Sequence, residues 1–433
     1  MSSTTENASI LALAEGILSN TKSLIEQLNA SNTALPTFSA TSQALPTTPD
    51  FQALQIRLKA QLEDLQLLVS GPASFYRHFL VRGYEIATFQ LALDFEFFTI
   101  VPSKGSISVE DLAEQAGLDV DRTGRLMRML ITQRFFTEPN PGFFSHNSFS
   151  IALQKDEEIR SMVHFSFDEI LKACAESGAA IKADPYNSDG LHCPFYKRFG
   201  VPIFDYYEKN PQYAGRFAKA MAGWVKMANN STDTANGYSW ADLRGTVVDM
   251  GGGSGHVSVE LAQAFPHLSF AVQDGDGTML ALGPKLLTPD LKDRISFTQA
   301  SFFEPQKHLG AAAYLIRQCT HNWADADVVR IFKSMVPALE GSAPGTPFLI
   351  NDMILPEPGT TIERIWERER RHVDMVMLVC YGSKERTVKE FDKLLKEADE
   401  RFVIKNVHNE DHGALGMIEA YLNHGTNGTN GTH

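Results

Sequence analysis

A run of glycines in the C-terminal half of the chain has a spacing that could serve chemistry. The short strand-forming run Thr246-Val247-Val248-Asp249-Met250 leads directly into Gly251-Gly252-Gly253-Ser254-Gly255, and a helix-forming segment follows. Glycines permit a tight turn from strand to helix and let a ligand approach the backbone without Cβ atoms in the way. We therefore predict a ligand-binding turn with contacts from Gly251, Gly253 and Gly255.

An acidic residue completes this pattern. After a predicted helix at 257–264, a second apolar strand at 268–273 ends in Asp274. A carboxylate about 20 residues beyond such a turn can accept hydrogen bonds from both hydroxyls of a ribose. The order strand, turn, helix, strand, acid is far more specific than a glycine turn alone, and it predicts a Rossmann-like nucleoside site.

The spacing of the glycines favours one cofactor over another. Dinucleotide sites follow the pattern GxGxxG, whereas here His256 stands at the position of the third glycine. S-adenosylmethionine (SAM) has no pyrophosphate, so its turn need not present a helix N-terminus to phosphate. Asp249, just before the turn, suits a ligand that carries an α-amino group and a sulfonium. We therefore predict SAM rather than NAD as the cofactor.

The elements around this turn indicate an α/β fold. Between residues 245 and 420, short apolar strands alternate with helical segments, which is typical of a doubly wound parallel sheet. We predict a C-terminal Rossmann-like SAM-binding sheet, preceded by a mostly α-helical winged-helix dimerisation domain.

The winged-helix prediction comes from residues 75–150. A helix is expected at 84–98, a second begins at a Ser108 cap and stops at Gly117, and Asp121 is expected to cap a third. Residues 135–144 then read as strand, turn, strand. Winged helices often bind DNA, but the acidic balance of this chain favours a packing or dimerisation role.

Further upstream, two more helices are expected at 8–30 and 51–69, with a stop signal at residues 70–72. The Ser/Thr/Pro-rich stretch between them reads as a flexible linker. The domains that we predict are N-terminal helices and linker (1–74), winged-helix dimerisation domain (75–155), helical linker lining the substrate pocket (156–240), SAM-binding domain (241–422) and disordered tail (423–433).

Composition restricts the partners and the compartment. The 433-residue chain has a formal net charge of −13, which argues against nucleic acid and against anionic membrane surfaces. No apolar run approaches the roughly 18–20 residues of a membrane span. The N-terminus lacks the pattern of a secretory signal, and the four cysteines form no CxxC pair. We expect a cytoplasmic protein with reduced thiols, no metal site and a small-molecule substrate.

Several further motifs carry a family resemblance over roughly residues 75–422. Beside the glycine turn stand His321-Asn322-Trp323, the strand Asn351–Leu355 with Asp352, and Gly382-Ser383-Lys384-Glu385-Arg386-Thr387. Together they resemble plant and fungal SAM-dependent O-methyltransferases that act on phenolics, flavonoids and polyketides. Some fungal proteins of this family are pericyclases or dehydratases that bind SAM without consuming it.

The resemblance implies roles for these residues. His321 would be the general base, and Asp352 and Glu385 would brace it. Ser301 stands before Phe302, where the family usually has an acid that faces the adenine. Arg317, four residues before His321, is a candidate for the methionine end of SAM.

This set of residues suits methyl transfer to an alcohol or phenol. SAM supplies the electrophile, so the protein must align the acceptor oxygen and remove its proton. A histidine with an ordinary pKa near 6.5 is largely neutral at pH 7 and can accept that proton. A nearby carboxylate would then stabilise the imidazolium. We expect His321 to act in this way.

Three residues are candidates for the substrate pocket: His164, a polar residue in an apolar helical stretch, Asn351 and Met375. His164 and Asn351 also keep open a pericyclase or dehydratase, which would depend on hydrogen-bond donors instead of a base. A non-catalytic SAM-binding or DNA-binding regulator is the third possibility. In each case the apolar N-terminal helices need a partner surface, so we expect a homodimer.

Overall fold

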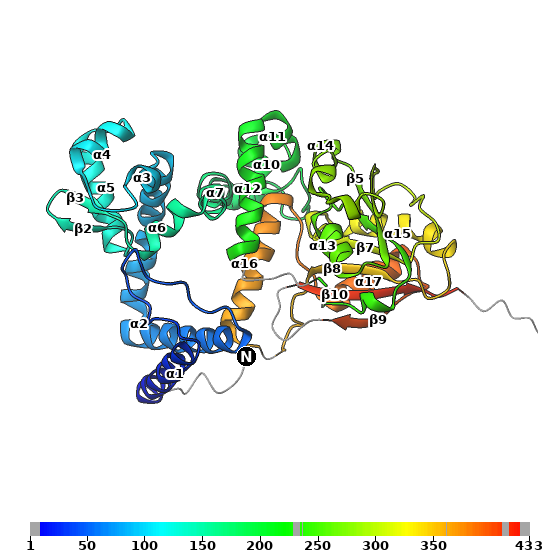
Figure 1. Ribbon diagram of the computed structural model, residues 1–433, viewed down its shortest axis with the longest axis horizontal. Coiled ribbons are helices and arrows are strands. Elements are labelled where there is room, and N and C mark those ends of the chain that lie inside the picture. Colours follow the sequence, from blue (N-terminus) through cyan, green and yellow to red (C-terminus); the bar gives the residue numbers. More distant parts are fainter. Residues whose placement is uncertain (1–8, 228–233, 236, 361, 409–414, 425–433) are drawn as a thin grey trace, which may run out of the picture. The chain divides into compact units, whose positions relative to one another are not determined.

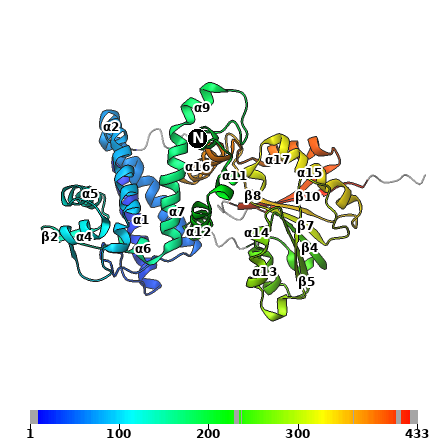
Figure 2. The same ribbon diagram turned by 90° about the horizontal axis from the view of Figure 1, so that it is seen from above.

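The computed structural model describes residues 9–227, 234–235, 237–360, 362–408 and 415–424. Of the predicted disordered tail (423–433), residues 425–433 lie outside these ranges. The chain divides into two compact units (Figures 1 and 2). Unit 1 comprises Met1–Lys172, Tyr206–Asn229 and Glu363–Ile365, and unit 2 comprises Ala173–Asp205, Asn230–Ile362 and Trp366–His433.

Unit 2 contains the large sheet. Its seven strands, within the described residues, have the order β6-β5-β4-β7-β8-β10-β9. The first five in this order are parallel, and β10 pairs antiparallel with both β8 and β9. The strands are β4 Gly245–Met250, β5 Leu268–Asp274, β6 Ile295–Gln299, β7 Ala313–Arg317, β8 Phe348–Met353, β9 Phe402–His408 and β10 Leu415–Leu422.

Helices cover both faces of this sheet, because alternate strand residues point to opposite sides. Val248 packs in one core with α15 (Asp325–Glu340) and α17 (Val388–Ala398), whereas Val247 packs in another with α13 (His256–Ala264). Figure 2 shows α13 on one side of the strands and α15 and α17 on the other. The predicted doubly wound α/β fold is confirmed.

Shorter elements complete unit 2. They are α9 Ser177–Ala183, α10 Pro194–Phe199, η2 Trp240–Asp242, α14 Gly277–Leu280, η3 Gly283–Leu286, η4 Pro289–Leu291 and η5 Thr320–Asn322. Three helices have residues in both units: α8 Leu171–Ala175, α11 Ile203–Lys209 and α16 Arg364–Tyr381.

Unit 1 is mostly helical and has one small sheet of order β1-β3-β2. Its strands are β1 Ile107–Ser108, β2 Thr137–Asn140 and β3 Phe143–Ser145. Its helices are α1 Ile10–Ala30, α2 Pro49–Asp94, α3 Phe97–Ile100, α4 Val109–Ala116, α5 Val120–Thr132, α6 Ser148–Lys155, α7 Glu157–Phe165, the π-helix η1 Ser166–Ile170 and α12 Pro211–Met227.

The caps of the winged-helix segment test the sequence patterns directly. Ser108 does cap α4, because its hydroxyl accepts a hydrogen bond from the Asp111 N–H, and Gly117 ends the helix at a φ of 68°. The predicted Asp121 cap of α5 is wrong. Asp119 has the extended backbone of a cap and accepts from the Arg122 N–H, which leaves Asp121 inside the first helical turn.

The expected helix stop at residues 70–72 is also wrong, since α2 continues through it with a kink. Gly71 has a non-helical φ of 65° and breaks the run of helical backbone. Pro72 can begin the next helical stretch because a proline at that position loses no hydrogen bond. The predicted linker before α2 is anchored around Phe38. The ring of Phe38 lies 6.0 Å from that of Phe149, its carbonyl accepts from the Ser148 N–H at 3.0 Å, and Ser39 forms a β-bridge with Asn147.

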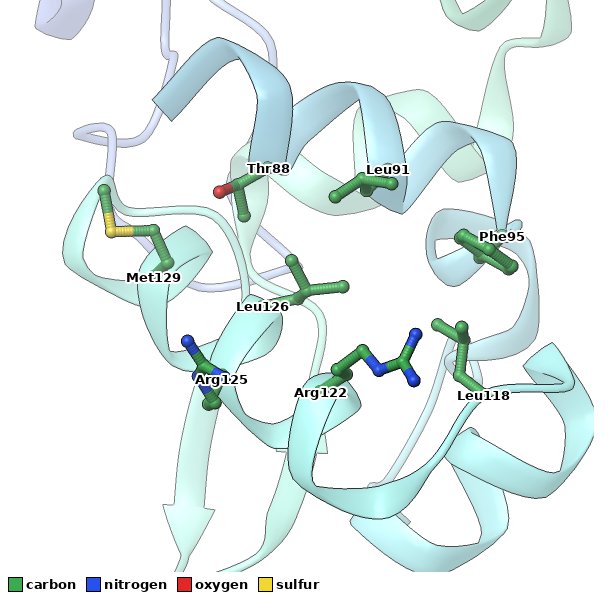
Figure 3. A pocket seen from close by; sticks show the side chains of 8 residues that line it. All are labelled: Thr88, Leu91, Phe95, Leu118, Arg122, Arg125, Leu126 and Met129. Atoms are coloured by element: carbon green, nitrogen blue, oxygen red, sulfur yellow. The ribbon is translucent and has the colours of Figure 1, made fainter. Parts of the chain in front are cut away.

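One face of α2 exposes apolar side chains. Tyr76, Leu80 and Tyr84 follow one another at helical spacing, and Leu80 and Tyr84 are 77% and 73% exposed. Beyond them, α2 and α5 enclose a groove of about 600 Å³ (Figure 3). Its lining is mainly apolar, with two arginines: Thr88, Leu91, Phe95, Leu118, Arg122, Arg125, Leu126 and Met129.

Two further features concern the whole described chain. No helix in the described ranges is long and apolar enough to cross a membrane. Of the four cysteines, Cys193, Cys319 and Cys380 are buried and Cys174 is exposed, and no disulfide joins them.

Candidate active site

Asp249, at the end of β4, is a buried carboxylate under the glycine turn. Its Oδ2 accepts a hydrogen bond of 2.6 Å from the hydroxyl of Ser258 on α13. Burial raises the pKa of Asp249, while Ser258 and the nearby Arg317 oppose that rise. The sequence patterns missed Ser258, although a polar residue in an apolar helix is a signal that could have found it.

Most glycines of the turn are required by the protein itself. A Cβ at Gly251 would lie 2.6 Å from Cys319 Sγ, and a Cβ at Gly252 would lie 2.7 Å from Asp249 Oδ2. At Gly255, a Cβ would lie 2.9 Å from the Phe297 ring. Close packing inside the fold therefore explains these three positions without a ligand.

Gly253 differs from its neighbours. A Cβ there would meet nothing closer than Met279 Cε at 3.8 Å, an ordinary van der Waals distance, so the surroundings leave room for it. The prediction that Gly251, Gly253 and Gly255 contact a ligand stays a prediction, and Gly253 is the one of the three where a Cβ would meet no close protein atom. Gly253 also has a φ of 57°, a conformation that side chains rarely adopt.

Asp274 joins the turn to the end of β5. Its Oδ2 accepts from the Gly253 N–H at 2.8 Å, and its Oδ1 accepts from the Asp276 N–H at 2.8 Å. A carboxylate oxygen has more than one acceptor site, so both oxygens retain capacity for ligand hydroxyls. The structure thus places the turn and its acid together, as the spacing predicts.

Arg317, at the end of β7, has an unmet donor. One terminal nitrogen donates to Gln318 Oε1 at 2.7 Å, but the buried Nε has no hydrogen-bond partner. Burial lowers the pKa of Arg317, although Asp249 and Asp352 stabilise its charge. A buried donor without a partner next to a buried acid fits the carboxylate and amine of an amino-acid group, as in SAM.

Ser301 and Phe302 follow β6. Ser301 is exposed, and its hydroxyl accepts from the Phe303 N–H at 3.2 Å. Phe302 packs beneath the turn, where a Cβ added at Gly251 would lie 3.2 Å from its ring. The centroids of the Phe302 and Trp323 rings are 6.0 Å apart. Phe302 therefore links the turn to the segment that carries His321.

His321 stands in the 3-10 turn η5, which follows β7, and two carboxylates face its Nδ1. Glu385 Oε1 lies 2.8 Å away, at hydrogen-bond distance, and Asp352 Oδ1 lies 3.7 Å away. Both acids are almost fully buried. Among the described residues no group hydrogen-bonds Nε2, so this nitrogen is available to a substrate.

The two acids are held in different ways. Asp352 Oδ2 accepts from both the N–H and the hydroxyl of Thr320, and the N–H contact is 3.1 Å. Glu385 contacts the ring directly, while its own N–H donates to Asp374 Oδ1 at 2.9 Å. One oxygen of each acid, Asp352 Oδ1 and Glu385 Oε2, is buried without a hydrogen-bond partner. The sequence motifs did not single out Thr320 or Asp374.

This arrangement changes the protonation expected for His321. Burial of the ring favours its neutral form, but the charges of Glu385 and Asp352 outweigh burial and raise the pKa to about 9. Burial raises the pKa of Glu385, against the opposing effect of His321. The expected ordinary value near 6.5 is therefore corrected: without ligands, the ring carries a proton at neutral pH.

The three candidates for a substrate pocket have other surroundings. His164 lies in α7 of unit 1, where its Nε2 is 2.7 Å from Asp94 Oδ1. The amide of Asn351, in β8, donates to the Gly416 carbonyl at 2.9 Å and so ties two strands together. Met375, on α16, is 51% exposed. None of them contacts the His321 cluster by a hydrogen bond that the structure records.

Comparisons with known proteins agree with this geometry. Residues 179–400 match the O-methyltransferase domain family, and residues 82–156 match the O-methyltransferase dimerisation domain family. The O-methyltransferase sol2 of Alternaria solani is 48% identical over 97% of both chains. The grayanic acid biosynthesis cluster O-methyltransferase of Cladonia grayi is 31% identical over 95% of this chain and 87% of its own.

Solved structures share the fold. The crystal structure of OxaC has a TM-score of 0.77 at 21% identity and covers 96% of this chain and 99% of its own. The glycine turn with its acid, the His321 cluster and the match of both domains lead to one conclusion. This chain belongs to the family of SAM-dependent O-methyltransferases.

Proposed function

We propose that this enzyme methylates a hydroxyl group of a small aromatic or polyketide-type secondary metabolite, with His321 as the general base. The observation that carries the proposal is the His321 ring, whose Nδ1 is 2.8 Å from Glu385 Oε1 while Nε2 has no hydrogen-bond partner among the described residues. A relative from a grayanic acid biosynthesis cluster supports an acceptor from secondary metabolism.

In the proposed reaction, SAM supplies an electrophilic methyl group on a positively charged sulfur. The acceptor hydroxyl would give its proton to His321 Nε2 while its oxygen forms the new bond to the methyl carbon, and the bond from that carbon to sulfur would break to leave the demethylated cofactor as a neutral thioether. Glu385 accepts the Nδ1–H, so when the ring loses its other proton, with a pKa of about 9, the neutral tautomer has its free lone pair on Nε2. The imidazolium that forms is then stabilised by Glu385 and, at longer range, by Asp352.

We further infer which residues would bind SAM, the methyl donor. Asp274 would bind the ribose hydroxyls through the acceptor capacity left on its two oxygens, and Gly253 would allow close approach. Arg317 and Asp249 would face the amino-acid end, where the Nε of Arg317 has no partner. Ser301 and Phe302 would lie toward the adenine.

The protein is also expected to be a homodimer that uses α2. The apolar stripe begins with Tyr76 and Leu80, just before the segment that matches the dimerisation domain, and ends with Tyr84 inside that segment. A stripe on one helix can pair with its own copy about a two-fold axis. We therefore predict that Leu80→Glu weakens the dimer, whereas Leu45→Glu, at an exposed apolar position outside the stripe, does not. Light scattering at micromolar concentration measures this, and a wild-type monomer would contradict it.

The stoichiometry of the cofactor tests the proposed function. The enzyme is incubated with methyl-labelled SAM and a panel of phenolic and polyketide metabolites, and mass spectrometry follows labelled product and demethylated cofactor. One demethylated cofactor per methylated product is the expected result. Conversion of a metabolite without any consumption of SAM would show instead a pericyclase or dehydratase and overturn the proposal.

A further inference from the structure

We propose that Arg386 is a positioning residue for methyl transfer, because its guanidinium fixes the backbone turn that carries His321 without touching the ring. This inference rests on the proposed role of His321 as the base. It concerns a residue next to Glu385 in the chain, so that one short segment would place both halves of the His321–Glu385 pair.

The contacts of Arg386 surround the histidine. Its side chain is 1% exposed. Nη1 donates to the Thr320 carbonyl at 3.0 Å and Nη2 donates to the Trp323 carbonyl at 2.8 Å. These carbonyls belong to residues on either side of His321. The guanidinium thus bridges the two ends of the turn that carries His321.

The remaining donors of Arg386 are also satisfied. Nε and Nη2 donate to Asp325 Oδ1 at 3.0 and 2.8 Å, and Nη1 also reaches the Lys384 carbonyl at 3.3 Å. A guanidinium has five N–H donors in a rigid planar fork, and here all five have acceptors. Asp325, the first residue of α15, anchors the fork and offsets the cost of burying its charge.

Neighbouring residues of the same segment act on the same turn. The hydroxyl of Ser383 donates to the carbonyl of His321 itself. The backbone of Arg386 is in turn fixed to the residues just after β8, because its carbonyl accepts from the Leu355 N–H at 2.9 Å. The 383–386 segment therefore holds the His321 backbone and presents Glu385 to its ring.

Two expected effects of removing Arg386 distinguish a role in positioning His321 from a role in fold stability alone. A shift of the turn would change the His321–Glu385 distance, and a misplacement of about 1 Å can cost on the order of 10²-fold in rate. The charge of Arg386 also lowers the pKa of His321, whereas the charges of Glu385 and Asp352 raise it. The remaining nearby charge is Asp374, which acts on Glu385 by raising its pKa. Loss of the cation should therefore move the alkaline rise of activity to higher pH.

The test compares Arg386→Met with Arg386→Lys in the full-length enzyme. Arg386→Met is expected to lower kcat by about 10–100-fold, leave the SAM dissociation constant within about twofold, and shift the pH profile upward. Arg386→Lys should restore the wild-type pH profile, since it keeps a cation. It should recover only part of kcat, because an ammonium cannot reproduce the planar fork.

Two controls separate the possible causes. Arg330→Met removes an exposed arginine of α15 that pairs with Asp327 at 2.8 Å, and it should leave kcat unchanged. If Arg386→Met does not fold by circular dichroism, Asp325→Asn and Ser383→Ala decide the question, and each should lower kcat more than SAM affinity.

Folded Arg386→Met with wild-type kcat and pH profile, or loss of SAM affinity in step with kcat, would overturn this inference. In the case of a non-folding Arg386→Met, wild-type kcat in both replacement variants would do the same. A wild-type enzyme that transfers no methyl group would instead overturn the proposed function.

Discussion

The glycine turn and the His321 cluster lie at the carboxyl ends of strands in one sheet, yet they are built differently. The turn and its acid come from residues 249–274, a single strand-helix-strand unit, and close packing of glycines shapes it. The cluster joins Thr320, His321, Asp352 and Glu385 from three separate segments through buried charges and hydrogen bonds. The first should therefore be sensitive to added volume, and the second to altered charge.

The largest effect is expected from removal of the proposed base. His321→Ala should lower the chemical rate by about 10²–10⁴-fold, the usual contribution of a positioned base. SAM affinity should barely change, because the lost interaction belongs to the transition state. Single-turnover kinetics and calorimetry measure the two quantities. An unchanged rate would show that the cluster does not carry the chemistry.

A second prediction distinguishes the two acids. Because Glu385 contacts the ring and Asp352 is tied to Thr320, Glu385→Gln should reduce kcat by about 10²-fold and Asp352→Asn by about tenfold. The wild-type kcat/KM for SAM, which reports the free enzyme, should rise with pH up to about 9, where His321 loses its proton.

The same profiles check the sign of the charge effect. Both acids raise the pKa of His321, so either substitution should move the rise in kcat/KM to lower pH. Equal losses of kcat for the two variants, or profiles that do not move, would contradict the division of roles inferred from the distances.

At the glycine turn, Asp274→Asn should weaken SAM binding without lowering the rate at saturating SAM. The substitution removes the charge that would accept ribose hydroxyls, and it loosens the bonds to the Gly253 and Asp276 N–H groups. Hydrogen bonds to a charged group contribute roughly 1.5–3 kcal/mol each, so a loss of about 10–100-fold in affinity is expected. Calorimetric titration measures it, with Asp276→Asn as the neighbouring control.

The smallest effect separates two adjacent glycines. Gly252→Ala should lower the free energy of unfolding by about 1–3 kcal/mol, because its Cβ would collide with Asp249 and Val272 at 2.7 and 2.9 Å. Gly253→Ala meets no such obstacle and should lower the free energy of unfolding by about 1–2 kcal/mol, through its positive φ alone. It should nevertheless weaken SAM binding more than Gly252→Ala does. Thermal unfolding and titration compare them, and the reverse order of SAM affinities would contradict the assignment.

Local sequence patterns predicted the features that depend on neighbours in the chain. The alternation of strands and helices, the Ser108 cap and the Gly117 stop all follow from side-chain period and backbone preference. The same rules misplaced the α5 cap by two residues, at Asp121 instead of Asp119, because both aspartates precede the same apolar pattern. They also read Gly71-Pro72 as a stop, where packing continues α2 through a kink.

By itself, the sequence determined the strand-turn-helix-strand unit with Asp274, and it singled out the three polar residues that meet in the His321 cluster. Tertiary structure alone decided that Glu385 contacts His321, that Thr320 holds Asp352, and that Arg386 clamps the turn. It also decided that a Cβ at Gly252 would collide with Asp249. Backbone preferences act over a few residues, whereas burial and Coulomb attraction between distant segments arise only after the chain has brought them together.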